Sequence, residues 1–347
     1  MMSVLAPLAL TVSTGALLAL PLTPAMRELI SKRDAGPLVT RKDDGKIDNF
    51  ARALRVRSEP FQPWITRCAE QEISEAFDMP QGKIFVFGKP GAWDGPNRID
   101  AFVLCAQPVS LPDGFQSTED FFAKDSVKAG QKNLFRALLS ESDIVLGDDT
   151  RILRWVHAES NLIVGRLCAL FGRASAGKSA TLTEGCAFER LHAPVIYSSI
   201  GAMKLDIRRE SAPFSKLARG GIGRKRSHGS IHLMADEQHY GDLVSLKALR
   251  LDEGACVYGS VKANGHVELA RRAEVDGSLV STKHIHIASG SFVKGPLIAE
   301  RDIVIDSGVQ IGLPDVPTTV SARRIRIAPG CVLHGTAWAR VEGRVGD

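Results

Sequence analysis

Apolar residues recur at every sixth position through the stretch 249–299 and continue beyond it. Nearly all members of one phase are apolar: Leu251, Val257, Ala263, Leu269, Val275, Ser281, Ile287, Val293, Ala299, Ile305 and Ile311. A second period lies on top of the first, because Gly259, Gly277 and Gly295 are 18 residues apart. Coils of 18 residues with three six-residue sides are typical of a parallel β-solenoid. The stretch therefore predicts a stack of three-sided coils in a fold dominated by β-strands.

Each side of such a coil is a short strand in which apolar and polar residues alternate. Each corner needs a residue that tolerates a positive φ angle. The repeat offers glycines for these corners, together with Asn264, Asp276 and Ser289. We expect these residues to form the corners.

The same rhythm extends in both directions. The unit Trp155–Ala169 matches Leu249–Ala263 position for position, which aligns Trp155 with Leu249 and Leu167 with Val261. After residue 299 the pattern continues, slips by four residues around Leu313–Pro317 and returns. These matches predict a β-helix in two parts, over residues 143–198 and 243–347.

The residues before the first coils show a mixed pattern. Strand-like runs occupy 83–88 and 100–106, whereas 118–123 and 131–140 have apolar residues at helical spacing. Residues 61–142 therefore predict a small α+β element. Because the end of a solenoid needs cover, we expect this element to cap the first coil.

The amino-terminal stretch 1–26 contains no charged side chain. Its run Val4–Leu22 is mostly apolar and about as long as a membrane-spanning helix. Arg27, Lys32 and Arg33 follow it, which by the positive-inside rule places the rest of the chain in the cytoplasm. The pattern predicts a single-pass anchor in the cytoplasmic membrane, with 27–60 as a juxtamembrane linker. A cleaved signal peptide and a shallow interfacial segment stay open as alternatives.

A basic segment separates the two predicted parts of the β-helix. Residues 199–242 carry a cluster of basic side chains: Lys204, Arg208, Arg209, Lys216, Arg219, Arg224, Lys225 and Arg226. Such a composition is typical of an inserted loop, either solvated or bound to an anionic lipid or an acidic protein. Because it lacks interleaved aromatic residues, sequence-specific binding of nucleic acid is not expected.

Composition adds little to this picture. With 44% hydrophobic and 24% charged residues the chain is an ordinary folded protein, and its formal net charge of +5 is mildly basic. The six cysteines are scattered without a CxxC pair: Cys68, Cys105, Cys168, Cys186, Cys256 and Cys331. Buried, reduced thiols are expected rather than a disulfide framework.

The sharpest local motif is Gly172–Ser179, which satisfies the phosphate-binding pattern G-x-x-x-x-G-K-[ST]. In a nucleotide site Lys178 would reach the phosphates and Ser179 the magnesium ion. That loop must open a helix, but the following residues are β-branched and reach Gly185 within a turn and a half. A solenoid corner is therefore favoured over a nucleotide-binding loop.

The histidines give two further candidates for chemistry. His284 and His286 lie on one face of a predicted strand, and the alternation with Ile285 and Ile287 points both toward solvent, so a metal pair is not favoured. An acyltransferase on a hexapeptide β-helix needs a catalytic histidine that faces a groove between subunits, for which His266 or His334 are candidates. No catalytic constellation stands out, so no catalytic, cofactor or metal residue is assigned and we do not expect an enzyme.

The repeated Val-x-Gly-x-Val/Leu-x-Ala block resembles the bactofilins, a family of bacterial polymer-forming cytoskeletal proteins. It occurs at Val257–Ala263, Ile163–Ala169 and Val293–Ala299. The resemblance implies a right-handed triangular β-helix that stacks end to end into non-polar filaments without nucleotide. It also implies attachment to the cytoplasmic membrane and a scaffolding role for cell-wall or polysaccharide-synthesis proteins.

The expected partner is thus a second copy of the chain. The last coil of a solenoid presents unpaired N–H and C=O groups, and no helix follows Val332–Val345 to cover them. End-to-end contact through this segment is expected, as a dimer, a short oligomer or a filament.

Overall fold

The computed structural model describes residues 2–23, 26, 49–80, 82–205, 207–208 and 223–346. The chain divides into two units, Met1–Lys46 and Ile47–Asp347. The first contains α1 (Met2–Ala19) and the 3-10 turn η1 (Leu20–Leu22). The second contains every other element.

The membrane-spanning helix predicted over residues 1–26 is wrong. Among the described residues, no helix is both long enough and apolar enough to span a membrane. The 18 residues of α1 rise about 27 Å, short of a hydrocarbon core of about 30 Å, and Ser13 and Thr14 lower its apolar character. Pro21 lies in the 3-10 turn that follows. The predicted location in the cytoplasmic membrane is corrected by the same finding.

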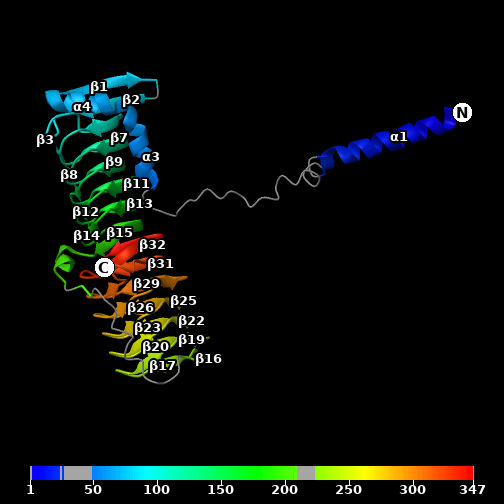
Figure 1. The fold of residues 1–347 in the computed structure, drawn as a ribbon, viewed down its shortest axis with the longest axis vertical. Coiled ribbons are helices and arrows are strands. Elements are labelled where there is room, and N and C mark those ends of the chain that lie inside the picture. Colours follow the sequence, from blue (N-terminus) through cyan, green and yellow to red (C-terminus); the bar gives the residue numbers. More distant parts are fainter. Residues whose placement is uncertain are drawn as a thin grey trace. The chain divides into compact units, whose positions relative to one another are not determined.

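The second unit is a β-solenoid of about 14 turns, which confirms the fold predicted from the repeat. It consists of two halves, and the coils of each half pair in parallel. In Figure 1 the first half runs from the cyan strands to the green ones, and the second from yellow-green to red. The second half begins at the end remote from the first and returns to it, so the last coils of the two halves meet.

The first half has three sides, named A, B and C. Side A contains β2 (Gly82–Phe87), β5 (Phe102–Cys105) and the later parts of β7 (Gln116–Ala123), β9 (Leu134–Ser140), β11 (Arg151–Ala158) and β13 (Ala169–Ala176). Side B contains β3 (Gly91–Ala92), β6 (Val109–Leu111), β8 (Val127–Ala129), β10 (Ile144–Leu146), β12 (Asn161–Val164) and β14 (Ser179–Leu182). Side C contains β4 (Arg98–Ile99) and the earlier parts of the long strands. The last coil is β15 (Ala187–Tyr197), which covers all three sides.

The second half repeats this plan. One side contains β16 (Lys225–Ser227), β19 (Leu243–Ser245), β22 (Val261–Ala263), β25 (Leu279–Ser281) and β28 (Leu297–Ala299). The next contains β17 (Ile231–Leu233), β20 (Leu249–Leu251), β23 (Val267–Leu269), β26 (Ile285–Ile287) and β29 (Asp302–Ile305). The third contains β18 (Gln238–Tyr240), β21 (Cys256–Tyr258), β24 (Glu274–Val275), β27 (Phe292–Val293) and β30 (Gln310–Ile311). β31 (Thr318–Ile327) and β32 (Val332–Val345) close the stack.

The small α+β element predicted over residues 61–142 is wrong. Outside the coils, the amino-terminal part of this unit has two short helices, α3 (Asn49–Ser58) and α4 (Gln62–Gln71), with the 3-10 turn η2 (Glu59–Phe61) and the strand β1 (Ser74–Met79). The helices predicted at 118–123 and 131–140 are strands of the solenoid. Their apolar runs mislead because both faces are buried: Phe121 faces the solenoid core, and Phe122 packs in the cluster formed with α3 and α4.

The second half also starts earlier than predicted. The loop predicted over 199–242 contains η3 (Ile200–Lys204), and β16 begins at Lys225. Residue 206 and residues 209–222 of that predicted loop lie outside the described residues.

The corner chemistry differs from the prediction. A recurring corner of the second half has positive φ at Asp236, Gly254, Arg272 and Gly290, and not at Asn264, Asp276 or Ser289. The glycine column has another cause: a Cβ on Gly259 would lie 2.3 Å from the carbonyl oxygen of Gly241 in the preceding coil. These glycines allow the coils to stack closely.

Core substitutions test this architecture. Leu279 is fully buried in β25, whereas its neighbour Val280 is half-buried. We expect Leu279→Ala to lower the free energy of unfolding by about 2–5 kcal/mol, because it leaves a cavity in a packed coil. Val280→Ala should lower it by less than about 1 kcal/mol. Denaturant unfolding measures both, and equal losses would contradict the assigned register.

Candidate functional site: the ends and the junction of the solenoid

The two halves join through antiparallel pairing of their last coils. β15 pairs with β32 on all three sides, with Phe188 opposite Gly343, Leu191 opposite Ala337 and Ile196 opposite Leu333. Each last coil would otherwise present unpaired backbone groups. Because the halves run toward each other, each satisfies the edge of the other.

Side chains reinforce this junction on its outer surface. The Arg190 guanidinium lies 4.1 Å from the ring centre of Trp338, within cation–π distance. His192 Nδ1 lies 2.9 Å from Thr336 Oγ1. Ser198 Oγ donates a hydrogen bond to the Ala328 carbonyl at 2.7 Å and accepts one from the Cys331 amide at 2.7 Å.

The segment expected to be an exposed end is therefore covered. Val332–Val345 forms β32, which pairs with β31 on one edge and with β15 on the other. The sequence shows the missing cap after this segment but not that the first half supplies one.

The amino-terminal end of the solenoid is closed in a different way. β1 adds an antiparallel strand to the edge of β2, pairing Ser74 with Phe87. Trp93 is 8% exposed, and its ring centre lies 4.9 Å from that of Phe87 and 5.2 Å from that of Phe115. Trp93 thus closes the core above the first coils. β1 itself carries Glu75 and Asp78, charges that discourage further pairing at this edge.

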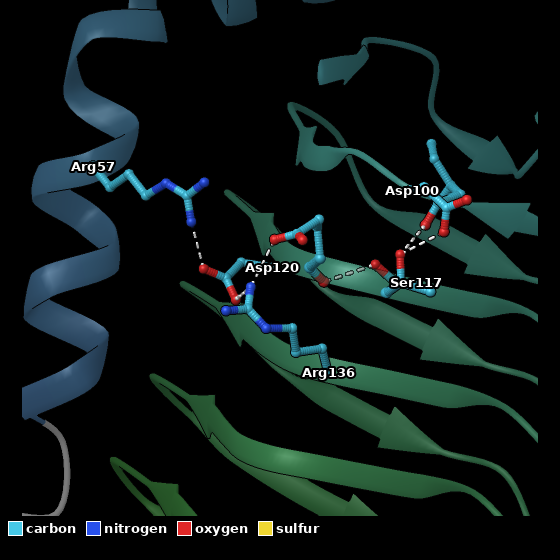
Figure 2. Close-up of polar contacts among 8 residues, drawn as sticks. Arg57, Asp100, Ser117, Asp120 and Arg136 are labelled. Carbon is cyan, nitrogen blue, oxygen red and sulfur yellow. Dashed lines mark hydrogen bonds and ion pairs between the residues drawn. The ribbon is translucent and has the colours of Figure 1, made fainter. Parts of the chain in front are cut away.

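Helix α3 is fixed to the side of the first half by an ion-pair network, shown in Figure 2. Asp120 lies between two arginines: Oδ2 is 2.6 Å from Arg57 Nη1 and Oδ1 is 3.0 Å from Arg136 Nη1. The Asp120 side chain is 11% exposed, so solvent screens these contacts weakly. The Arg57 guanidinium also lies 4.5 Å from the ring centre of Phe102. The network attaches the helix through β7 and β9.

The first coil of the second half is the uncovered end. β16, β17 and β18 pair with β19, β20 and β21 of the next coil. Within the described ranges no strand pairs with their outer edges. This end carries both charge types, with Lys225 and Arg226 on β16 and Asp236 and Glu237 just before β18.

The chain between the halves is held against the second half by Arg208. Its guanidinium binds both carboxylate oxygens of Glu274, at 2.6 and 2.9 Å, and lies 4.6 Å from the ring centre of Phe292. Its backbone amide donates to Gln310 Oε1 at 2.9 Å, and Gln310 Nε2 donates to its carbonyl at 2.8 Å. This basic residue of the predicted loop therefore has a structural role.

The motif Gly172–Ser179 forms a strand, a turn and a strand. Gly172 lies in β13 and Ser179 opens β14, so no helix begins at the motif. The Lys178 amide donates to the Ser160 carbonyl at 2.8 Å, and Ser179 Oγ donates to Asn161 Oδ1 at 2.7 Å. These residues stack on the preceding coil, as the favoured interpretation of a solenoid corner expects.

Most of the candidate histidines lie on the surface. His284 Nδ1 is 3.3 Å from Asp302 Oδ2, and His286 Nε2 is 3.1 Å from Asp306 Oδ2. The two carboxylates lie 18 and 20 residues further along, a spacing that could have revealed both pairs. His266 is exposed and its ring centre lies 5.2 Å from that of His284. The described residues contain no group of three or more His, Cys, Asp or Glu that could hold a metal ion.

His334 is the exception, because it is buried and lines a cavity beside the junction. Its Nδ1 lies 3.1 Å from the Pro194 carbonyl oxygen. Burial lowers the pKa of His334 below its usual value.

All six cysteines are free and buried. Burial raises the pKa of the Cys105 thiol and raises that of Cys331 to about 11. Raised pKa values leave little reactive thiolate at neutral pH.

In comparisons with known proteins no family model matches this chain, and no curated protein and no solved structure matches it. The class of the protein, a parallel β-solenoid with two halves, therefore rests on the fold itself.

The clamp on α3 can be tested at Asp120. Asp120→Asn removes a shielded negative charge from between Arg57 and Arg136, and we expect it to lower the free energy of unfolding by about 1–2 kcal/mol. Asp100→Asn is the matched control, since the Asp100 side chain is 65% exposed, and should change stability by less than about 0.5 kcal/mol. Denaturant unfolding compares the two; a neutral Asp120→Asn would show that the network does not stabilise the fold.

The antiparallel junction predicts a specific cross-link. His192 and Thr336 are opposite each other and in side-chain contact, so the double variant His192→Cys/Thr336→Cys should form a disulfide on mild oxidation. The bond should form within one chain at any dilution, as read by intact mass and non-reducing electrophoresis. The pair His192→Cys/Arg344→Cys should not cross-link, because Arg344 lies opposite Ala187. Cross-linking only between chains would contradict the intrachain junction.

Proposed function

We propose that this chain is a structural scaffold: a rod of two β-solenoid halves that pairs with a second copy through the end formed by β16, β17 and β18. One observation carries the proposal. This end has unpaired edges on all three sides among the described strands, whereas β32 is covered by β15 and β2 by β1. An open edge is a template for another chain.

The hydrogen bonds of β16 identify the groups available for pairing. The Lys225 amide donates to the Asp242 carbonyl, and the Ser227 carbonyl accepts from the Leu246 amide. In a parallel ladder alternate residues bond to the same neighbour, so the N–H and C=O of Arg226 face away from β19. The same alternation in β17 makes His232 the outward-bonding residue, since the Ile231 amide donates to the Ala248 carbonyl.

The junction within the chain supports this mode of contact. There two solenoid ends of this protein already join by antiparallel pairing on three sides. A two-fold axis through β17 would bring β16 of one copy against β18 of the other, and so Lys225 near Glu237. Opposite charges at such a contact favour one arrangement over others.

A closed dimer follows from this arrangement rather than a filament. Filaments need two free ends, and the amino-terminal end is closed by β1 and Trp93. The proteins that such a dimer would organise are, by the resemblance to bactofilins, those of cell-envelope or polysaccharide synthesis.

Substitution of Arg226 tests the proposed dimer. Arg226→Pro removes the outward N–H and adds a ring at the edge, while the bonds of Lys225 and Ser227 to the next coil remain. We expect the dimer Kd to rise at least about tenfold, because symmetry removes the hydrogen bond twice. Arg226→Ala keeps the N–H and serves as the matched control.

Sedimentation of the 47–347 segment, from about 1 to 100 times the wild-type Kd, measures the effect. Wild type and Arg226→Ala should dimerise as concentration rises, with Arg226→Pro remaining a monomer of unchanged thermal stability. A wild type that stays monomeric at the highest concentrations reached, or an Arg226→Pro dimer as tight as wild type, would refute the proposal.

A further inference from the structure

A cavity of about 660 Å³ opens beside the junction of the two halves. Its walls come from the end of β15, from η3 with the residues after it and from the turn that follows β30. The residues that matter here are Tyr197, Met203, Leu205, Asp315 and His334. The volume lies within the range of sites that bind small molecules.

The walls are largely apolar and open to solvent. Met203 is 48% exposed and Leu205 is 43% exposed, although both are large apolar side chains. Pro194, Val195 and Pro314 extend the same surface. Exposed apolar side chains that gather around one cavity are typical of a binding site for an apolar group.

His334 supplies the polar group of the cavity, and its hydrogen bonding fixes its tautomer. The side chain is 97% buried, since 3% remains exposed. Nδ1 lies 3.1 Å from the Pro194 carbonyl oxygen, which can only accept, so Nδ1 carries the proton. Because burial lowers the pKa of His334, the ring is neutral at neutral pH and Nε2 presents a lone pair.

That lone pair is unsatisfied. Nε2 is buried and has no hydrogen-bond partner among the residues that the structure describes. A buried polar atom without a partner destabilises a protein, and its presence points to a water or a ligand. A ligand that satisfies Nε2 must donate a hydrogen bond.

We propose that this cavity binds a small hydrophobic alcohol or phenol, whose hydroxyl donates to Nε2 of His334 while its apolar body packs against Met203 and Leu205. A carboxylate does not fit, because it has no proton to donate and would lie near Asp315. An apolar compound without a donor leaves Nε2 unsatisfied. The site lies within one chain, so it does not depend on the proposed dimer.

A matched pair of probes isolates the hydrogen bond. 2-Naphthol and 2-methoxynaphthalene share one apolar body, and only the first can donate. Calorimetry or ligand-observed NMR on the wild-type chain should give a Kd at least about fivefold lower for 2-naphthol. Equal Kd values for the two probes, or no binding of either, would overturn the proposal.

Two variants and one spectroscopic readout locate the effect. His334→Phe should abolish the preference for 2-naphthol, whereas Met203→Ala should weaken both probes by similar factors and keep it. With ¹⁵N-labelled histidine, 2-naphthol should shift the Nε2 resonance of His334 and leave that of the exposed His266 in place. This readout decides the matter in the wild-type protein if His334→Phe does not fold, and an unmoved His334 resonance would place the probe elsewhere.

Discussion

Backbone hydrogen bonding at the ends of the coils is the constraint on which the structure depends. A β-solenoid satisfies its N–H and C=O groups by stacking coils, but the first and last coils of any stack have one unsatisfied edge. The chain resolves two of these edges by turning its second half toward its first, so that β15 and β32 pair antiparallel. This pairing joins the two stacks without a third domain between them.

The other features follow from where the remaining ends fall. At the amino-terminal end β1 and Trp93 cover the first coils, and α3 and α4 pack on outward residues of side A such as Phe102 and Phe122. At the opposite end β16, β17 and β18 keep an open edge. The molecule thus has one end suited to assembly, and its antiparallel junction creates a cavity that a single uninterrupted stack would not contain.

The repeat predicted the second half well and the first half poorly, for a physical reason. Strands of the second half are buried on one face only, so the alternation of apolar and polar residues is clean: Leu249 and Leu251 are buried and Arg250 is exposed. The repeat aligns Trp155 with Leu249, but Val156 is the residue buried in the core. Trp155 faces outward and packs against Phe50 of α3, with ring centres 4.3 Å apart. A shift of one residue exchanges the faces of a strand, and the helices hide the shift by burying the outer face too.

The sequence by itself determined the solenoid, its coil length of 18 residues and the slip near Leu313, because each depends on contacts between neighbouring coils. It did not determine that α1 is too short to span a membrane, that 82–142 belongs to the stack, or that Val332–Val345 is covered. The tertiary structure decided these points, and it alone brought His334 to Pro194 across 140 positions of the chain. Periodicity records what each residue packs against one coil away, whereas the pairing of two ends joins segments that share no repeat.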